Sequence, residues 1–253
     1  MIAIMIAGAV ATLVSLFGTR FLIIFFQARG QGQPILVEDD KTLGLEHHMP
    51  KQGTPTMGGL AIVGAALVGW IAAHVRDLPF SDQAMIVWVG VLAMAAMGLA
   101  DDWIKVRKRH NRGIFWKQKN YITMIMSIGM AWWLVSSTGI SETISLTRAG
   151  DLGFEVPQFV WVLWAGMLIW ATTNAVNVTD GLDGLAGGSA LMGFGAFMII
   201  GYWALRNPDI YEVVNPLDMG VFAAAFGGAC LGFLWWNAAP ARIFMGDVGA
   251  LGL

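Results

Sequence analysis

The chain has 253 residues, of which 57% are hydrophobic and 13% charged, and its formal net charge is −2. Soluble domains carry roughly 25% charged residues, so this composition excludes an ordinary soluble protein and indicates a polytopic membrane protein. The net charge by itself says nothing about partners. The single cysteine, Cys230, excludes an intramolecular disulfide framework, and its small and apolar neighbours predict a packing residue inside a helix.

Seven apolar runs approach the length of a membrane-spanning helix, roughly 20 residues, and predict an all-α integral membrane bundle. The first run has no basic segment before it and is too long for a signal-peptide core, so we expect a retained helix. An eighth run begins near Val248 and stops at Leu253, so we expect a single membrane domain over 1–253 whose C-terminal helices are absent. The seven runs are Ile2–Phe26, Met57–Ala73, Ala84–Ala100, Tyr121–Ser137, Phe159–Val178, Leu185–Ala204 and Gly220–Trp236.

The distribution of basic residues predicts how the chain crosses the membrane. Of the fifteen Lys and Arg residues, eleven fall in loops on one side, three in loops on the other, and Arg20 lies within the first run. Cytoplasmic loops carry the excess of Lys and Arg, so we expect the N-terminus outside. Four unusually polar segments then share the cytoplasmic face: 47–59, 101–102, 174–188 and 235–247.

The segment 174–188, NAVNVTDGLDGLAGG, is the most polar stretch next to apolar runs. Asn174 and Asn177 are three residues apart, as are Asp180 and Asp183, so each pair could share a helical face. Its glycines allow tight turns and a close approach to a ligand. Ionisable groups at the edge of a hydrocarbon layer indicate function, while the structural alternative is a polar loop between helices.

Further carboxylates fall on the same predicted face. Asp101 and Asp102 end the third run, and adjacent carboxylates at a membrane edge either raise one pKa or recruit a cation such as Mg²⁺. A solvated helix end is the alternative. Asp247 opens the eighth run, ten residues after Asn237 at the end of the seventh.

Lysines accompany these carboxylates and point to phosphate chemistry. Lys51, Lys105 and Lys119 lie near glycine-rich turns, a combination that suits a diphosphate compound handled with Mg²⁺. No Walker-type phosphate loop or EF-hand pattern occurs. Most of the basic run 105–119 is interpreted as an orienting, lipid-binding loop rather than a nucleic-acid site, and His47 and His48 as solvated loop residues.

A secondary transporter is the main alternative from another class. It would hold its carboxylates near the bilayer midplane on broken helices of paired halves. Here the carboxylates fall at the cytoplasmic ends of the predicted helices, and no paired halves are visible. A purely structural scaffold would not need five carboxylates on one face.

Four motifs carry a resemblance to a known family: KQGTPTMGG from Lys51, LADDWIK around Asp101, NAVNVTDGLDGLAGG from Asn174, and FLWWNAAPARIFMGDVG from Phe233. Together they resemble the phospho-N-acetylmuramoyl-pentapeptide transferases of bacterial peptidoglycan synthesis. The resemblance implies Mg²⁺-dependent transfer from UDP-MurNAc-pentapeptide to undecaprenyl phosphate at the inner membrane, giving lipid I and UMP, and often a homodimer. Relatives that transfer N-acetylglucosamine 1-phosphate are the alternative, although the Thr54 to Gly59 element favours the former.

The resemblance also implies roles for individual residues. Asp247 would bind the metal, Asp101 would be the base for the lipid phosphate, and Asp102 would organise the metal and phosphates. We expect direct attack by an oriented lipid phosphate. The family has about ten helices, so we expect residues 1–253 alone to be inactive, and Gln52 replaces a basic residue of many members. Substrate-binding positions implied around the uridine and the cleft are Lys51, Thr56, Lys105, Lys119, Asn174, Asn177, Asp180, Asp183, Asn237 and Phe244.

Overall fold

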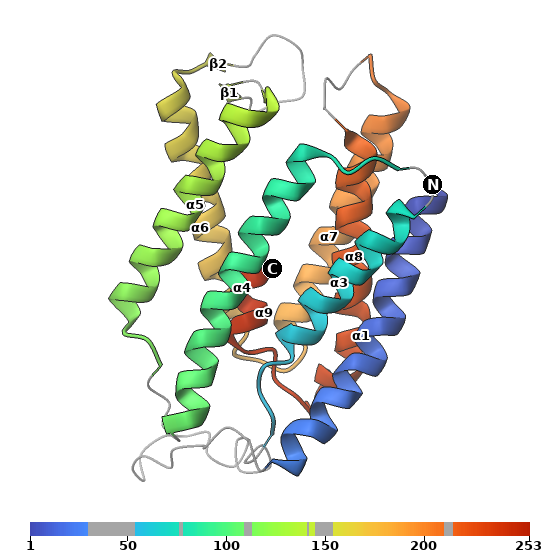
Figure 1. Cartoon of the computed structure of the whole chain (residues 1–253), viewed down its shortest axis with the longest axis vertical. Helices are drawn as coiled ribbons and strands as arrows, with labels where there is room; N and C mark the ends of the chain where they lie inside the picture. Colours follow the sequence, from blue (N-terminus) through green and yellow to red (C-terminus); the bar gives the residue numbers. More distant parts are fainter. Residues whose placement is uncertain (30–53, 76–77, 109–112, 141, 145–153, 210–214) are drawn as a thin grey trace.

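The protein forms a bundle of helices, shown in Figure 1 as a computed structural model. The model describes residues 1–29, 54–75, 78–108, 113–140, 142–144, 154–209 and 215–253. Within these ranges there are eight α-helices and one antiparallel pair of two-residue strands. The elements are α1 (Ile2–Ala28), α3 (Gly59–His74), α4 (Asp82–Lys108), α5 (Trp116–Thr138), β1 (Thr143–Ile144), β2 (Phe154–Glu155), α6 (Gln158–Thr179), α7 (Leu185–Arg206), α8 (Pro216–Asn237) and α9 (Gly246–Gly252).

The predicted all-α membrane architecture is confirmed, with seven helices in the seven apolar runs and α9 at the start of the eighth. Six of the described helices are long and apolar enough to cross a membrane. The two exceptions are α9, with seven residues, and α3, which has 16 residues because an irregular segment, 54–58, takes up the start of its apolar run. A further difference concerns α4, which continues to Lys108, so Asp101 and Asp102 lie within a helix rather than at its end.

Helix α8 is the most buried of the candidate spans and packs against α1, α3 and α7. Small residues allow α1 to approach it closely, because a side chain at Gly228 would collide with the backbone of Gly8, and one at Gly232 with the backbone around Thr12. Two small residues four positions apart thus allow the close approach of helices that is common in membrane proteins. The expectation for Cys230 is confirmed, since it is fully buried on the same helix.

A buried polar cluster joins α3, α4 and α8 at one end of the bundle. The Asp218 carboxylate accepts hydrogen bonds from the Trp70 indole N–H at 2.8 Å and from both the backbone N–H and the hydroxyl of Ser81, at 2.9 and 2.6 Å. His74 Nε2 lies 3.1 Å from Asp218 Oδ1 without forming a hydrogen bond. Asp218 is only 2% exposed, so these donors replace the water that a carboxylate would otherwise bind.

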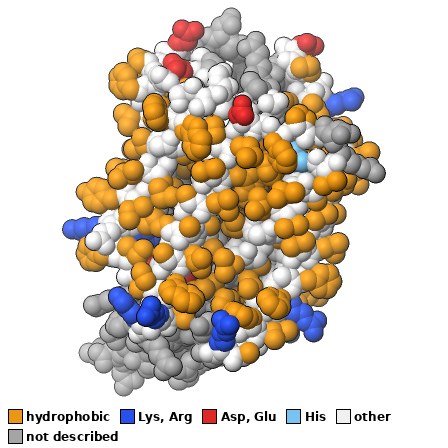
Figure 2. Space-filling view, in the orientation of Figure 1, with side chains coloured by type: hydrophobic (Ala, Val, Ile, Leu, Met, Phe, Trp, Pro, Cys, Tyr) orange, Lys and Arg blue, Asp and Glu red, His pale blue; other side chains and the backbone are white. Residues whose placement is uncertain are grey.

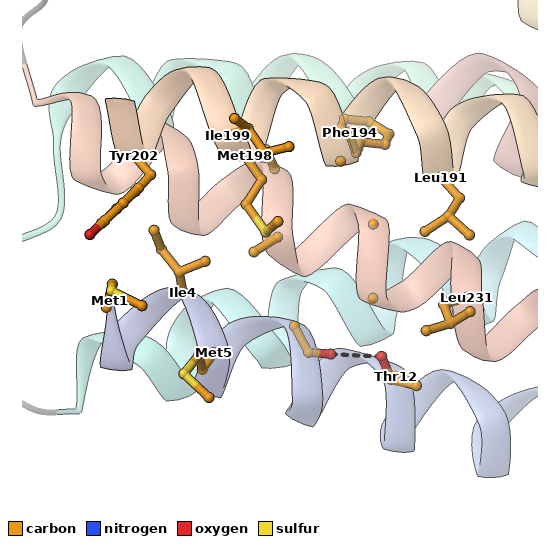
Figure 3. A pocket seen from close by; sticks show the side chains of 16 residues that line it. Met1, Ile4, Met5, Thr12, Leu191, Phe194, Met198, Ile199, Tyr202 and Leu231 are labelled. Atoms are coloured by element: carbon orange, nitrogen blue, oxygen red, sulfur yellow. Dashed lines mark hydrogen bonds between the residues drawn. The ribbon is translucent and has the colours of Figure 1, made fainter. Parts of the chain in front are cut away.

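The face shown in Figure 2 is apolar over a broad band, as expected for helices that face lipid. On the face in Figure 2, most visible Lys and Arg side chains lie toward the lower end, and the visible Asp and Glu toward the upper end. Between α1, α7 and α8 there is an apolar cavity of about 480 Å³, shown in Figure 3. Its lining has no charged side chain, and the hydrogen bond drawn there runs from the Thr12 hydroxyl to the Gly8 carbonyl.

Candidate active site

Three carboxylates from two helices meet inside the bundle. Asp101 and Asp102 come from α4 and Asp247 from the first turn of α9, and one oxygen of each lies within 4.8 Å of the other two. Asp101 and Asp102 are 2% and 3% exposed. Because the last of these residues follows the first by well over a hundred positions, the cluster depends on the packing of α9 against α4.

Two lysines approach the same carboxylate oxygen. Lys105 Nζ and Lys119 Nζ each lie 2.7 Å from Asp247 Oδ2. Lys105 Nζ is also 2.6 Å from Asp101 Oδ2, one helical turn away on α4, and 3.8 Å from Asp102 Oδ1. Lys119 ends the basic run of the sequence and lies in the first turn of α5. Alternating positive and negative groups therefore form one continuous, partly buried cluster.

Glycines allow α9 to pack against its neighbours without side chains between them. A Cβ at Gly98 of α4 would collide with the backbone of Asp247, and one at Gly59 of α3 with the backbone of Gly249. Gly246 has a φ of 72°, and a Cβ there would lie 2.6 Å from Asp102 Oδ2. These three positions have no room for a side chain, and the close packing that they allow determines where α9 places Asp247 in the cluster.

The segment 54–58 holds the loop that leads into α9. Phe244 N–H donates to the Pro55 carbonyl at 2.8 Å, and its own carbonyl accepts from Gly58 N–H at 2.9 Å. One residue further on, Gly59 N–H donates to the Met245 carbonyl at 2.8 Å. Two motifs that are far apart in the sequence are therefore joined by backbone hydrogen bonds directly beside Asp247.

Asp180 lies near this cluster, just beyond the end of α6. Burial, together with the nearby carboxylates of Asp247 and Asp102, raises the pKa of the Asp180 carboxyl to about 7, against the lowering effect of a hydrogen bond from the Gly246 backbone. Asp180 and Asp183 do not share a helical face, because α6 ends at Thr179 and both residues lie in the turn before α7. That interpretation of their spacing was wrong.

Asp183 and Asn237 join the turn before α7 to the loop before α9. Asp183 accepts a hydrogen bond from Ala241 N–H at 3.0 Å, and Asn237 accepts one from Gly184 N–H at 3.0 Å. The amide of Asn237 also donates to the Ile243 carbonyl at 2.9 Å. These contacts show that both side chains hold the turn before α7 against the loop before α9, in addition to any contact that they make with a substrate.

The remaining predicted positions include residues of α6 and of the segment before α3. Asn174 donates to the Trp170 carbonyl of its own helix at 2.8 Å. Asn177 on α6 is half-buried, as are Thr56 in the segment before α3 and the Phe244 side chain. Lys51, like His47, His48 and Gln52, lies outside the described residues.

Sequence reasoning missed two backbone donors that hold the carboxylates. Ile114 N–H donates to Asp101 Oδ1, and Val248 N–H donates to Asp102 Oδ2 at 3.2 Å. Ile114 follows Gly113, at which a Cβ would collide with the Asp101 carboxylate. The glycine within the basic run was the available signal, and it was overlooked because that run was interpreted as an orienting loop.

The fold and the site together define a multi-pass membrane protein with a buried carboxylate and lysine centre that could hold a metal ion. Residues 84–253 match the model of glycosyl transferase family 4, and residues 51–63 match the phospho-N-acetylmuramoyl-pentapeptide-transferase signature 1. The chain is 41% identical to the phospho-N-acetylmuramoyl-pentapeptide-transferase of Frankia alni, over 99% of this chain and 73% of the relative. It is 42% identical to the enzyme of that name from Mycobacteroides abscessus, with the same coverage.

The chain therefore belongs to the phospho-N-acetylmuramoyl-pentapeptide-transferase family, within glycosyl transferase family 4. This confirms the resemblance found in the four motifs. It also assigns the protein to the phospho-sugar transferase enzymes rather than to the secondary transporters.

Proposed function

We propose that the protein transfers phospho-MurNAc-pentapeptide from UDP-MurNAc-pentapeptide to undecaprenyl phosphate, forming lipid I and UMP. The observation that carries this proposal is the cluster of Asp101, Asp102 and Asp247 with Lys105 and Lys119. Family membership supplies the reaction class, and the cluster supplies groups suited to diphosphate chemistry: lysines for the phosphate oxygens and carboxylates for a divalent cation.

We propose Mg²⁺ as the cation. The residues fit such an ion because three carboxylates can each offer an oxygen within 4.8 Å of the others, and carboxylate oxygens are the ligands that Mg²⁺ prefers. Asp247 would be a ligand, with Asp102 beside it. When bound, Mg²⁺ would polarise the phosphate oxygens and offset the negative charge that develops on them.

The protein side chains would bind and orient the two phosphates. Lys105 and Lys119 already lie at one carboxylate oxygen, so a diphosphate entering there would meet two ammonium groups. Asp101 would accept a proton from the acceptor phosphate. An oxygen of that phosphate would attack the phosphorus attached to the sugar, and the bond to the UMP oxygen would break. Most of the rate would come from orientation and charge stabilisation.

We further propose that this centre faces the cytoplasm from a bacterial inner membrane. The support is the excess of Lys and Arg in the loops predicted to be cytoplasmic, which include the one after α4. Asp101 and Asp102 lie in the C-terminal part of α4, which ends at the lower end of the bundle in Figure 1. That the chain forms a single membrane domain and that it dimerises stay predictions.

The choice of donor tests the proposal. Membranes containing the protein would be given undecaprenyl phosphate, Mg²⁺ and either UDP-MurNAc-pentapeptide or UDP-N-acetylglucosamine, and UMP release would be measured. We expect release with the first donor only. Release with the second alone would favour an N-acetylglucosamine-1-phosphate transferase, and no release with either would contradict both assignments.

A further inference from the structure

A second polar pocket lies apart from the carboxylate cluster, between the C-terminal half of α1 and the loop before α9. Its volume is about 560 Å³. Two arginines line it, Arg20 from α1 and Arg242 from the loop. The polar Gln27 and Thr54 and the apolar Trp236 also line it. In contrast to the apolar cavity of Figure 3, this pocket therefore combines two positive charges with an apolar wall.

Contacts through Trp236 explain why the two arginines share this pocket. The Trp236 indole N–H donates to the Leu16 carbonyl on α1 at 2.9 Å, one helical turn before Arg20. The Arg242 guanidinium lies 5.6 Å from the centre of the Trp236 ring, within the range of a cation–π interaction. The backbone N–H of Arg242 also donates to the Trp236 carbonyl at 2.8 Å. The Trp236 indole thus connects Arg242 in the loop to α1, the helix that carries Arg20.

The two guanidinium groups have no acidic partner in the part of the chain that the structure describes. Neither Arg20 nor Arg242 forms an ion pair with a described carboxylate, and both side chains are exposed. Two like charges in one pocket repel each other unless an anion lies between them. Guanidinium groups bind phosphate through paired hydrogen bonds, so a phosphate group matches the two arginines of this pocket.

The position of the pocket indicates that its anion belongs to a lipid. Arg20 lies eight residues before the end of α1, which at about 1.5 Å per residue is roughly 12 Å along a helix that can cross the membrane. An arginine at this depth extends its side chain toward the headgroup layer. Ile23, Ile24 and Trp236 provide apolar lining next to the charges, as an acyl chain requires. Charged headgroup and hydrocarbon would therefore both be accommodated.

We propose that this pocket binds the headgroup of an anionic phospholipid, with Arg20 and Arg242 on its phosphate. The pocket shares no residue with the proposed catalytic cluster, but the two are connected through Pro55. Thr54 and Pro55 line the pocket, and Pro55 holds Phe244, three residues before Asp247. A bound headgroup would therefore lie against the segment 54–58, which is hydrogen-bonded to the residues just before Asp247.

Native mass spectrometry of the protein in detergent would test this proposal, with phosphatidylglycerol and phosphatidylcholine as the two probes. We expect retained phosphatidylglycerol in the unmodified protein, with affinity falling roughly five-fold for each of Arg20→Gln and Arg242→Gln, as for basic residues at anionic membranes. Arg206→Gln, which removes an arginine at the end of α7, is the matched control and should bind as the unmodified protein does. Equal binding by all variants would overturn the proposal.

Two further arms separate the possible sources of the phosphate. Displacement of phosphatidylglycerol by millimolar inorganic phosphate would assign the pocket to a free anion, and retention of undecaprenyl phosphate without phosphatidylglycerol would assign it to the acceptor; either result would overturn the phospholipid assignment. Should a glutamine variant fail to fold, fluorescence gives a second measurement. Brominated phosphatidylglycerol should quench the unmodified protein more than a Trp236→Phe variant, and equal quenching would contradict the proposal.

Discussion

Lys119 Nζ lies 2.7 Å from Asp247 Oδ2, a contact between the first turn of α5 and the first turn of α9 across 128 positions of the chain. Lys105 reaches the same oxygen at the same distance. Both ammonium groups therefore compete with a metal ion for Asp247, and both are available to a phosphate. Removing one of these lysines should therefore strengthen metal binding and slow turnover.

The variant Lys119→Gln should bind Mn²⁺ more tightly and react more slowly. Removing one positive charge near the carboxylates lowers the electrostatic cost of a second cation, so we expect a several-fold gain in Mn²⁺ affinity by electron paramagnetic resonance. Loss of a charged hydrogen bond to the phosphates, about 1.5–3 kcal/mol, should slow UMP release roughly 10- to 100-fold. Lys117→Gln is the control, because that exposed side chain contacts Trp116 instead. Weaker Mn²⁺ binding by Lys119→Gln would contradict the competition.

Two glycines of α3 should respond differently to the same substitution. In Gly59→Ala the new methyl group meets the backbone of Gly249, so α9 must move and Asp247 with it. We expect a loss of about 1–3 kcal/mol of stability and at least a ten-fold loss of UMP release. Gly64→Ala should be harmless, since a Cβ there meets nothing within 4 Å. Thermal unfolding and activity of the two variants would check this, and equal effects would refute the packing argument.

These glycines also show which features could be predicted from the sequence and which could not. The apolar runs predicted the helices because spanning length and hydropathy are properties of local sequence. Asp101, Asp102 and Asp247 were singled out for their chemistry, because charge beside apolar runs is costly. The contact of Gly59 with Gly249 could not be predicted, since helix packing depends on which faces meet. Nor could spacing show that Asp180 lies in a turn, where its hydrogen-bond donor is the backbone of Gly246, the first residue of α9.

The buried carboxylate of Asp218 should stabilise the bundle without affecting catalysis. In Asp218→Ala the Trp70 indole and the Ser81 backbone N–H lose their acceptor, at roughly 1–3 kcal/mol for each buried unsatisfied donor. We therefore expect a clearly lower thermal midpoint. Activity per folded molecule should stay within two-fold of the unmodified protein, roughly the effect of 0.4 kcal/mol on a barrier, because this cluster lies away from Asp247.

The exposed Asp209 provides the control for that experiment. Asp209→Ala removes a carboxylate from the loop after α7 without a buried donor losing its partner, so its thermal midpoint should not change. A midpoint of Asp218→Ala equal to that of Asp209→Ala would show that the buried cluster contributes no stability.

The carboxylate cluster as the place of phosphate transfer is tested most directly by Asp247→Asn. UMP release from UDP-MurNAc-pentapeptide would be measured in membranes over a range of Mg²⁺ concentrations, with Asp209→Asn alongside. The predicted result is Mg²⁺-dependent release by the unmodified protein and by Asp209→Asn, and at least a ~100-fold lower rate in Asp247→Asn at equal expression. Release by Asp247→Asn at the unmodified rate, with the same Mg²⁺ dependence, would contradict the account.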